Sequence, residues 1–205
     1  INLEKNFEEY KENIKNKDKK HAYEIHRTLI KYKKLKNTLQ DLKVEVLESD
    51  HNDLDFKKII DEKKIQLHEK NKKNKLNENF RKIFDNLIKS KQINFYLISL
   101  INNNEPLARC FGFKYKNTFY YYIPTVLPNS FNNYKPGKIL ILKLIQWCIK
   151  NKIAKFDFGL GSEKYKKYFS NTEISLHRYY NFYTFRGLLA YTFMLMIFQI
   201  KKFWL

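Results

Sequence analysis

The spacing of apolar and polar residues predicts helices in the first part of the chain. Residues 5–38 carry apolar side chains three and four positions apart between lysines and glutamates, which is the period of an amphipathic helix. Residues 42–48 alternate apolar and charged positions and predict a half-buried strand. The polar stretch 49–55 supplies N-cap side chains, so we expect a helix from there to Lys70 and, after a Lys/Asn-rich loop, another over 78–90.

At residue 93 the pattern changes to that of strands. Ile93–Ile101 and Leu107–Tyr115 flank a turn-forming Asn-Asn-Asn-Glu-Pro cluster and predict a hairpin. A third strand, Thr118–Val126, contains Pro124. Because proline cannot donate to the ladder, we expect the pairing to fail or to bulge there.

The rest of the pattern predicts a helical crossover. The segment that opens at Pro136-Gly137 and continues through Ile139–Ile149 is apolar on nearly every side and must therefore be covered. After it we expect a strand, a short helix, a last strand and an apolar terminal helix, at Ile153–Phe158, Ser162–Phe169, Glu173–Tyr183 and Arg186–Trp204. This order predicts an α/β (α+β) fold in which helices flank a mixed central sheet.

Composition adds a strong positive charge to this picture. A chain of 205 residues with 43% apolar residues can bury a packed core and is expected to form one domain. Its net charge of +19 comes from 35 Lys and five Arg, a lysine excess typical of an AT-rich genome, so composition drift explains part of it. After residue 92 only four carboxylates face 16 cations. That imbalance favours an anionic partner, which could be a phosphate-bearing cofactor, nucleic acid or a lipid surface.

The cysteines and histidines indicate no metal site. Cys110 and Cys148 lie in apolar segments, and the five histidines lack metal-ligand spacing. We therefore predict that both cysteines are core residues and that the protein is cytoplasmic, in a reducing compartment. No signal peptide opens the chain and its first residue is Ile, so we expect that its natural start is missing.

Two runs of sequence carry a resemblance to one family. Residues 134–145 read Tyr-Lys-Pro-Gly-Lys-Ile-Leu-Ile-Leu-Lys-Leu-Ile, and residues 156–166 read Phe-Asp-Phe-Gly-Leu-Gly-Ser-Glu-Lys-Tyr-Lys. They resemble the signature of the CelD/BcsL-type GNAT acyltransferases, Y-x-P-G-x-x-L-x-x-x-x-I followed by F-D-F-x-x-G-x-x-x-Y-K. The resemblance implies a GNAT domain over 41–184 and an apolar helix over 185–205. This family is also similar to the Fem-type aminoacyl transferases, in which two GNAT-like halves are fused, so the basic helical segment 1–40 would be the tail of a truncated first half.

The resemblance implies acetyl-CoA or another acyl-CoA as co-substrate and no metal. A helix N-terminus suits a pyrophosphate, and Lys135, Gly137 and Lys138 are expected to hold it. Only Gly137 remains, however, of the Q/R-x-x-G-x-G/A loop of most GNAT enzymes. The alternative is that Pro-Gly simply starts the helix.

The proline of the third strand implies a place for the pantetheine arm. GNAT folds have a splay between the fourth and fifth strands, whose open edge pairs with the pantetheine amides. A break at Pro124 would expose such an edge along Ile123, Thr125 and Val126, and a backbone N–H there would hold the oxyanion. The alternative is an ordinary edge strand near its end.

Two residues of the second motif are candidates for catalysis. Asp157 could take a proton from the acceptor amine as general base. Alternatively it is structural and binds backbone N–H groups of the Gly-x-Gly turn that follows, caps the short helix, or pairs with Lys155 or Lys166. Tyr165 could protonate the leaving thiolate, as a tyrosine does in many GNAT enzymes, or pack against its aromatic neighbours.

The family resemblance implies an N-acyltransferase that acts on an amino sugar or a polysaccharide precursor. One alternative is a Fem-like transferase that uses charged tRNA. Another is a non-catalytic module that docks on a membrane polysaccharide synthase through the terminal helix. The apolar run of that helix has 14 residues and spans roughly 21 Å, short of the ~30 Å hydrocarbon core. We therefore expect it to be buried or to lie peripherally at the inner face of the membrane; the oligomeric state is left open.

Overall fold

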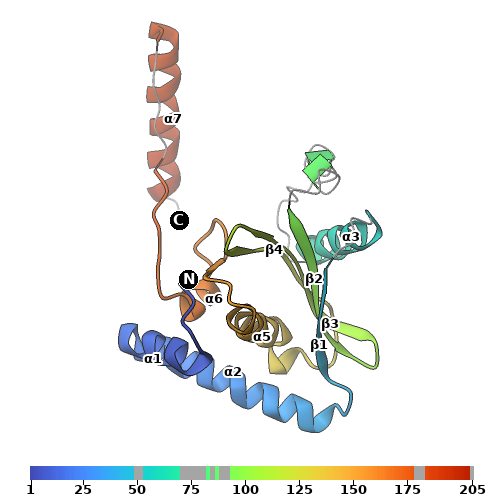
Figure 1. Ribbon diagram of the computed structural model, residues 1–205. Helices are drawn as coiled ribbons and strands as arrows, with labels where there is room; N and C mark the ends of the chain where they lie inside the picture. The colour runs from blue at the N-terminus through green and yellow to red at the C-terminus, as the bar shows by residue number, and fades with distance from the viewer. Residues whose placement is uncertain (49–52, 70–81, 84–85, 88–92, 178–182, 204–205) are drawn as a thin grey trace. The chain divides into compact units, whose positions relative to one another are not determined.

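The computed structural model describes residues 1–48, 53–69, 82–83, 86–87, 93–177 and 183–203 (Figure 1). They group into two compact units, Ile1–Glu173 and Ile174–Leu205. The two units are described separately below.

The first unit is built on a five-stranded mixed sheet with the strand order β1-β2-β3-β4-β5. The four strands β1 to β4 pair as an antiparallel meander, and β4 pairs with β5 in parallel. The predicted hairpin and mixed sheet are thus confirmed. The strands are β1 Lys43–Glu48, β2 Asn94–Asn102, β3 Glu105–Tyr115, β4 Thr118–Val126 and β5 Lys155–Asp157.

The parallel pair is short and leaves part of β4 without a strand beside it. A parallel neighbour requires a crossover, which helix α5, Pro136–Lys150, supplies after the 3₁₀ turn Asn132–Tyr134. Pairing with β5 covers only Thr118 to Tyr120 of β4. Within the described sheet, the rest of β4 therefore has a partner on its β3 side alone.

Helices cover both faces of the sheet, as Figure 1 shows. On one face α5 packs against the sheet and against helix α2, Lys19–Thr38. Helix α2 in turn packs with α1, Phe7–Lys17, and with the short helix α6, Lys164–Phe169. The buried side chains of α5 form the larger core there, together with residues such as Ala108 and Phe156. Helix α3, Asp53–Glu69, covers the opposite face and closes a smaller core around Phe56 and Phe111.

The single helix predicted over 5–38 is wrong, because it breaks at Asp18. This residue has an extended backbone, with φ −156° and ψ 116°, and it serves both flanking helices as a cap. Its N–H donates to the Ile14 carbonyl, and its carboxylate accepts from the Lys20 N–H at 2.7 Å. A short carboxylate offers the backbone this alternative to continuing a helix.

The predicted disruption at Pro124 falls elsewhere. Pro124 pairs in register with Cys110, and the shift lies between Phe111 and Gly112, so that Tyr122 is the extra residue of β4. A proline is tolerated in a ladder where its missing N–H points away from the neighbouring strand. The open side of β4 meets that condition, so no bulge is needed at the proline itself.

The last predicted strand is absent from the described residues. Glu173 to His177 and Tyr183 are not in a strand, and the rest of that prediction lies outside the described residues. The terminal helix is confirmed as α7, Phe185–Phe203. The helix predicted from 55 to 70 is confirmed as α3, whereas most of the one predicted over 78–90 lies outside the described residues.

Candidate functional site

The N-terminus of α5 begins in an unusual backbone conformation. Its N-cap, Lys135, is left-handed, with φ 59° and ψ 60°, and no side chain caps the helix. The N–H groups of Lys138 and Ile139 both donate to the Lys135 carbonyl, at 2.9 and 3.3 Å, and Pro136 has no N–H. Among the described residues, none accepts from the Gly137 N–H. The helix therefore presents one unused donor at its positive end.

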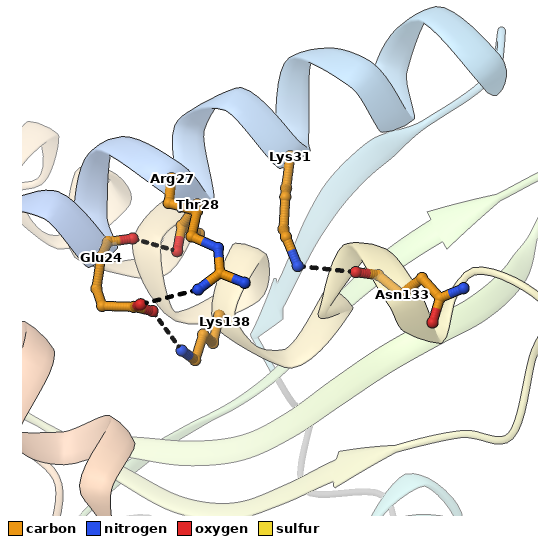
Figure 2. A network of polar contacts seen from close by, with 6 residues as sticks. All are labelled: Glu24, Arg27, Thr28, Lys31, Asn133 and Lys138. Atoms are coloured by element: carbon orange, nitrogen blue, oxygen red, sulfur yellow. Dashed lines mark hydrogen bonds and ion pairs between the residues drawn. The ribbon is translucent and has the colours of Figure 1, made fainter.

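Two cations of α2, Arg27 and Lys31, lie near this helix end (Figure 2). Lys31 Nζ donates to the Asn133 carbonyl at 2.8 Å, which ties α2 to the turn before α5. Glu24 accepts from Lys138 Nζ at 2.8 Å and from Arg27 at 3.1 Å. The cation cluster therefore contains one carboxylate and four cations, and it carries an excess of positive charge. Its members are Glu24, Arg27, Lys31, Lys135 and Lys138.

The ionisation of this cluster reflects that excess. Burial lowers the pKa of the Lys31 amine, and the positive charges of Arg27, Lys135 and Lys138 lower it further. The hydrogen bond from Lys138 lowers the pKa of Glu24. An anion bound among these residues would relieve the mutual repulsion of the cations.

A hollow lies beside Glu24. It has a volume of about 440 Å³ and is lined by Lys19, Lys20, Tyr23, Glu24 and Tyr168. The Lys138 amine also stands 4.7 Å above the centre of the Tyr168 ring. The hollow therefore shares Glu24 with the cation cluster and combines two lysines with two aromatic rings.

Gly137 allows α5 to approach β4 closely. A Cβ built at this position would lie 2.7 Å from Cγ2 of Val126, the last residue of β4. That separation is below any normal carbon–carbon contact. The absence of a side chain at Gly137 thus fixes the distance between the end of β4 and the first turn of α5.

The open edge of β4 is occupied by side chains of α3. Lys63 Nζ donates to the Pro124 carbonyl, and Gln66 Nε2 donates to the Val126 carbonyl at 3.2 Å. These carbonyls alternate along the strand and point away from β3. The backbone groups of Ile123 and Thr125 accordingly face β3. Of the three residues predicted to pair with a pantetheine arm, only Val126 presents its carbonyl at the open edge.

The second sequence motif folds into a clamped turn. Asp157 is exposed, and its Oδ1 accepts from the Gly159 N–H at 2.6 Å. Lys166 donates from the other side to the Leu160 carbonyl and pairs with Glu163 at 2.9 Å. Gly159 and Gly161 supply the positive φ angles, 68° and 114°, that the turn requires. The hydrogen bond of Asp157 is the one expected of a structural carboxylate in this position.

Tyr165 lies beside this turn and is partly buried. Its ring packs edge-on against Phe158, with 6.0 Å between the ring centres. Burial raises the pKa of the Tyr165 phenol, and the nearby Glu163 carboxylate raises it further. The hydroxyl therefore keeps its proton at neutral pH, so it can serve as a proton donor but not as a base.

A comparison with family models decides the family. Residues 19–167 match the model described as an acetyltransferase (GNAT) domain. The match runs from α2 to α6 and includes the α5 N-terminus, the open edge of β4 and the clamped turn. The chain belongs to the GNAT acetyltransferase family. No curated protein matches it.

The acetyltransferase domain brings together some of the predicted site residues and separates others. Lys135, Gly137 and Lys138 share one helix end, near the cations of α2. Asp157 lies near the other end of β4, because it pairs with Tyr120. Tyr165 belongs to α6, the helix whose Tyr168 ring lies under the Lys138 amine. Sequence reasoning missed Arg27 and Lys31, although their i, i+4 spacing places them on one face of α2.

The cysteines of the acetyltransferase domain are core residues, as predicted. Cys110 of β3 and Cys148 of α5 are both fully buried in the larger core. Burial raises the pKa of each thiol. Neither is therefore a thiolate nucleophile at neutral pH.

The second unit consists largely of α7. Several large apolar side chains of this helix are more than two fifths exposed, among them Leu188, Leu189, Phe193, Met194 and Met196. No acidic residue occurs from Ile174 to Leu205, while Arg178, Arg186, Lys201 and Lys202 are basic. Among the described residues, no helix has the length and apolar character needed to cross a bilayer.

Proposed function

We propose that this protein transfers an acyl group from acyl-CoA to the nitrogen of an amine. The observation that carries the proposal is the α5 N-terminus of a GNAT domain, where the unused Gly137 N–H adjoins the cations Lys31, Lys135 and Lys138. A helix end with free donors and nearby cations suits a pyrophosphate. The hollow lined by Lys19 and Lys20 would take the adenosine part of the same molecule.

The pantetheine arm would lie along the open edge of β4. Its amides pair there with the carbonyls of Pro124 and Val126, which at present accept from Lys63 and Gln66. Binding therefore exchanges two side-chain hydrogen bonds for two from the substrate. This exchange makes α3 the element that responds when acyl-CoA binds.

In the proposed reaction the acyl group passes directly from the thioester to the amine. The neutral amine attacks the thioester carbonyl carbon, a C–N bond forms and the C–S bond breaks. The thiolate takes the phenolic proton of Tyr165, and the proton released by the amine returns through solvent to the phenolate, so that Tyr165 is protonated again for the next cycle. Burial raises the pKa of Tyr165, so the residue enters the reaction with its proton in place. For Asp157, the bond to the Gly159 N–H supports a role in holding the turn.

The acceptor is proposed to be an amino sugar or a precursor of a surface polysaccharide. This part rests on the resemblance of residues 134–145 and 156–166 to the CelD/BcsL-type proteins. The fold by itself does not specify an acceptor.

Calorimetric titration with acetyl-CoA tests the cofactor part of the proposal. Lys31→Met should weaken binding about tenfold, because it removes a charge near the pyrophosphate. Lys34→Met is the matched control, since it removes the same charge from an exposed position of α2 and should change Kd less than twofold. Glu24→Gln should tighten binding. Absence of acetyl-CoA binding, or equal effects of the two lysine variants, would contradict the assignment.

A further inference from the structure

A row of polar residues crosses the α3 face of the sheet. The strand register places Glu45 of β1 opposite Ser99 of β2, Ser99 opposite Arg109 of β3, and Arg109 opposite Thr125 of β4. Directly opposed residues point to the same face of a sheet. The neighbouring row on this face is apolar and belongs to the smaller core, with Leu97, Phe111 and Ile123.

Helix α3 adds a carboxylate to the row. Glu62 Oε1 accepts from Arg109 Nη1, and the side chains of both residues are only 13% exposed. Thr125 is 1% exposed. The row therefore ends, at the open edge of β4, in a buried group of one carboxylate, one guanidinium and one hydroxyl.

Three polar atoms of this group lack a partner among the described residues. They are Glu62 Oε2, Arg109 Nε and Thr125 Oγ1. Proteins leave few buried polar atoms unpaired, because each one loses its hydrogen bonds to water without replacement. Three such atoms, on residues in direct register or contact, mark this group as a place where a polar ligand or water would be bound.

The chemistry of the three atoms restricts the ligand. Arg109 Nε only donates, Glu62 Oε2 only accepts, and the Thr125 hydroxyl can do either. A carboxylate or phosphate has nothing to donate to Glu62 and is repelled by it, while an ammonium ion alone has nothing to accept from Arg109. An amine with a hydroxyl on the neighbouring carbon satisfies both, since the amine donates to Glu62 and the hydroxyl accepts from Arg109.

We propose that Glu62, Arg109 and Thr125 form the acceptor subsite and select a vicinal amino alcohol that carries no carboxylate. The inference rests on the proposed acyl transfer, and it names the residues that recognise the acceptor. The position supports it: Thr125 lies between Pro124 and Val126, whose carbonyls form the edge proposed for the pantetheine arm. Displacement of Lys63 and Gln66 from those carbonyls would release the turn of α3 that carries Glu62.

Thr125→Val is the decisive variant, because it removes the hydroxyl and keeps the branched shape. Thr118→Val, at the far end of the same strand, is the matched control. With acetyl-CoA as donor and glucosamine as acceptor, Thr125→Val should raise the KM for glucosamine roughly tenfold or more. The acetyl-CoA Kd should stay within error of wild type, and the Tm should stay equal or rise, because the variant removes a buried hydroxyl that has no partner among the described residues. Glu62→Gln should act in the same direction, whereas Asp61→Asn, an exposed carboxylate of α3, should have no effect.

Several results would overturn the subsite. One is an unchanged KM for glucosamine in Thr125→Val, since the hydroxyl would then be only a buried unpaired group or a water ligand. Another is equal kcat/KM for glucosamine and cyclohexylamine, which has no hydroxyl; this result would leave the proposed acyl transfer intact.

Direct binding separates the two proposals. Glucosamine is titrated into wild type and Thr125→Val in the presence of CoA. Binding that Thr125→Val abolishes, without transfer to any amine, would support the subsite and refute the transferase. Equal rates of acyl transfer to glucosamine in both proteins would support the transferase and refute the subsite.

Discussion

Replacing Gly137 by alanine tests the close approach of α5 to β4. The added Cβ would lie 2.7 Å from Val126 Cγ2, about 1 Å inside the contact distance of two carbon atoms. Relieving such an overlap in a packed region costs about 1–3 kcal/mol. Alanine favours a helix over glycine by up to about 1 kcal/mol. The expected net loss of unfolding free energy is about 1 kcal/mol, or about 2–4 °C in Tm for a chain of this size.

Gly137→Ala should stabilise the protein instead of destabilising it when the obstructing methyl group of Val126 is absent. In a Val126→Ala background, Gly137→Ala meets no Cγ2 and keeps only its helix-forming advantage, so it should raise the unfolding free energy by up to about 1 kcal/mol. The coupling between the two sites is then about 1–3 kcal/mol, well above the error of a double-mutant cycle. Urea denaturation of wild type, the two single variants and the double variant measures it. Acetyl-CoA titration on the same four proteins shows whether the shifted helix end also weakens binding.

Stabilisation of wild type by Gly137→Ala would refute this reasoning. The helix end would then have room for a side chain, and Gly137 would serve only as an ordinary helix start. Equal destabilisation in both backgrounds would also contradict it, because the strain would not come from Val126.

Three further predictions concern the clamped turn, Tyr165 and α7. Tyr165→Phe should lower kcat by about 10²-fold or more while the acetyl-CoA Kd is unchanged. Because burial raises the Tyr165 pKa, deprotonation of this phenol should not lower the wild-type kcat between pH 7 and 10. A fall of kcat in that range that Tyr165→Phe removes would contradict the assignment. Asp157→Asn keeps an oxygen that accepts from the Gly159 N–H, so it should change kcat less than threefold. Asp157→Ala loses this hydrogen bond and should lower the Tm by about 2–4 °C. A collapse of kcat in Asp157→Asn would instead identify Asp157 as a general base. Phe193→Asp should reduce co-sedimentation with phosphatidylglycerol vesicles about tenfold, and equal binding of wild type to phosphatidylcholine vesicles would exclude an electrostatic contact with anionic lipid.

Local sequence predicted those elements in which the spacing of apolar residues directly reflects which sides of the element are buried. Helix α5 is apolar on nearly every side because helices and the sheet cover it, so its existence and its burial could both be expected. The turn after β5 was predictable for a related reason. Its glycines, Asp157 and Lys166 lie within ten residues of one another, and their hydrogen bonds are local.

What the sequence could not predict depends on contacts between distant segments. The Asp18 break is hidden by a helical period that continues through it, and only the cap hydrogen bonds on both sides reveal it. The pairs Glu62–Arg109 and Lys31–Asn133 join residues far apart in the chain. The register of Pro124 with Cys110 determines toward which edge of β4 the missing N–H of the proline points. The alternation of residues within one strand does not determine that register.

The hydrogen bonds from Lys63 and Gln66 to β4 also bear on how the protein behaves at high concentration. A strand with unpaired carbonyls on one side is a template for the strand of another molecule. Here a charged lysine and an amide, both from the same chain, fill the positions that an invading strand would need. Variants that remove both side chains should therefore aggregate during expression even if the folded domain keeps its stability, and acyl-CoA should protect them by occupying the same edge.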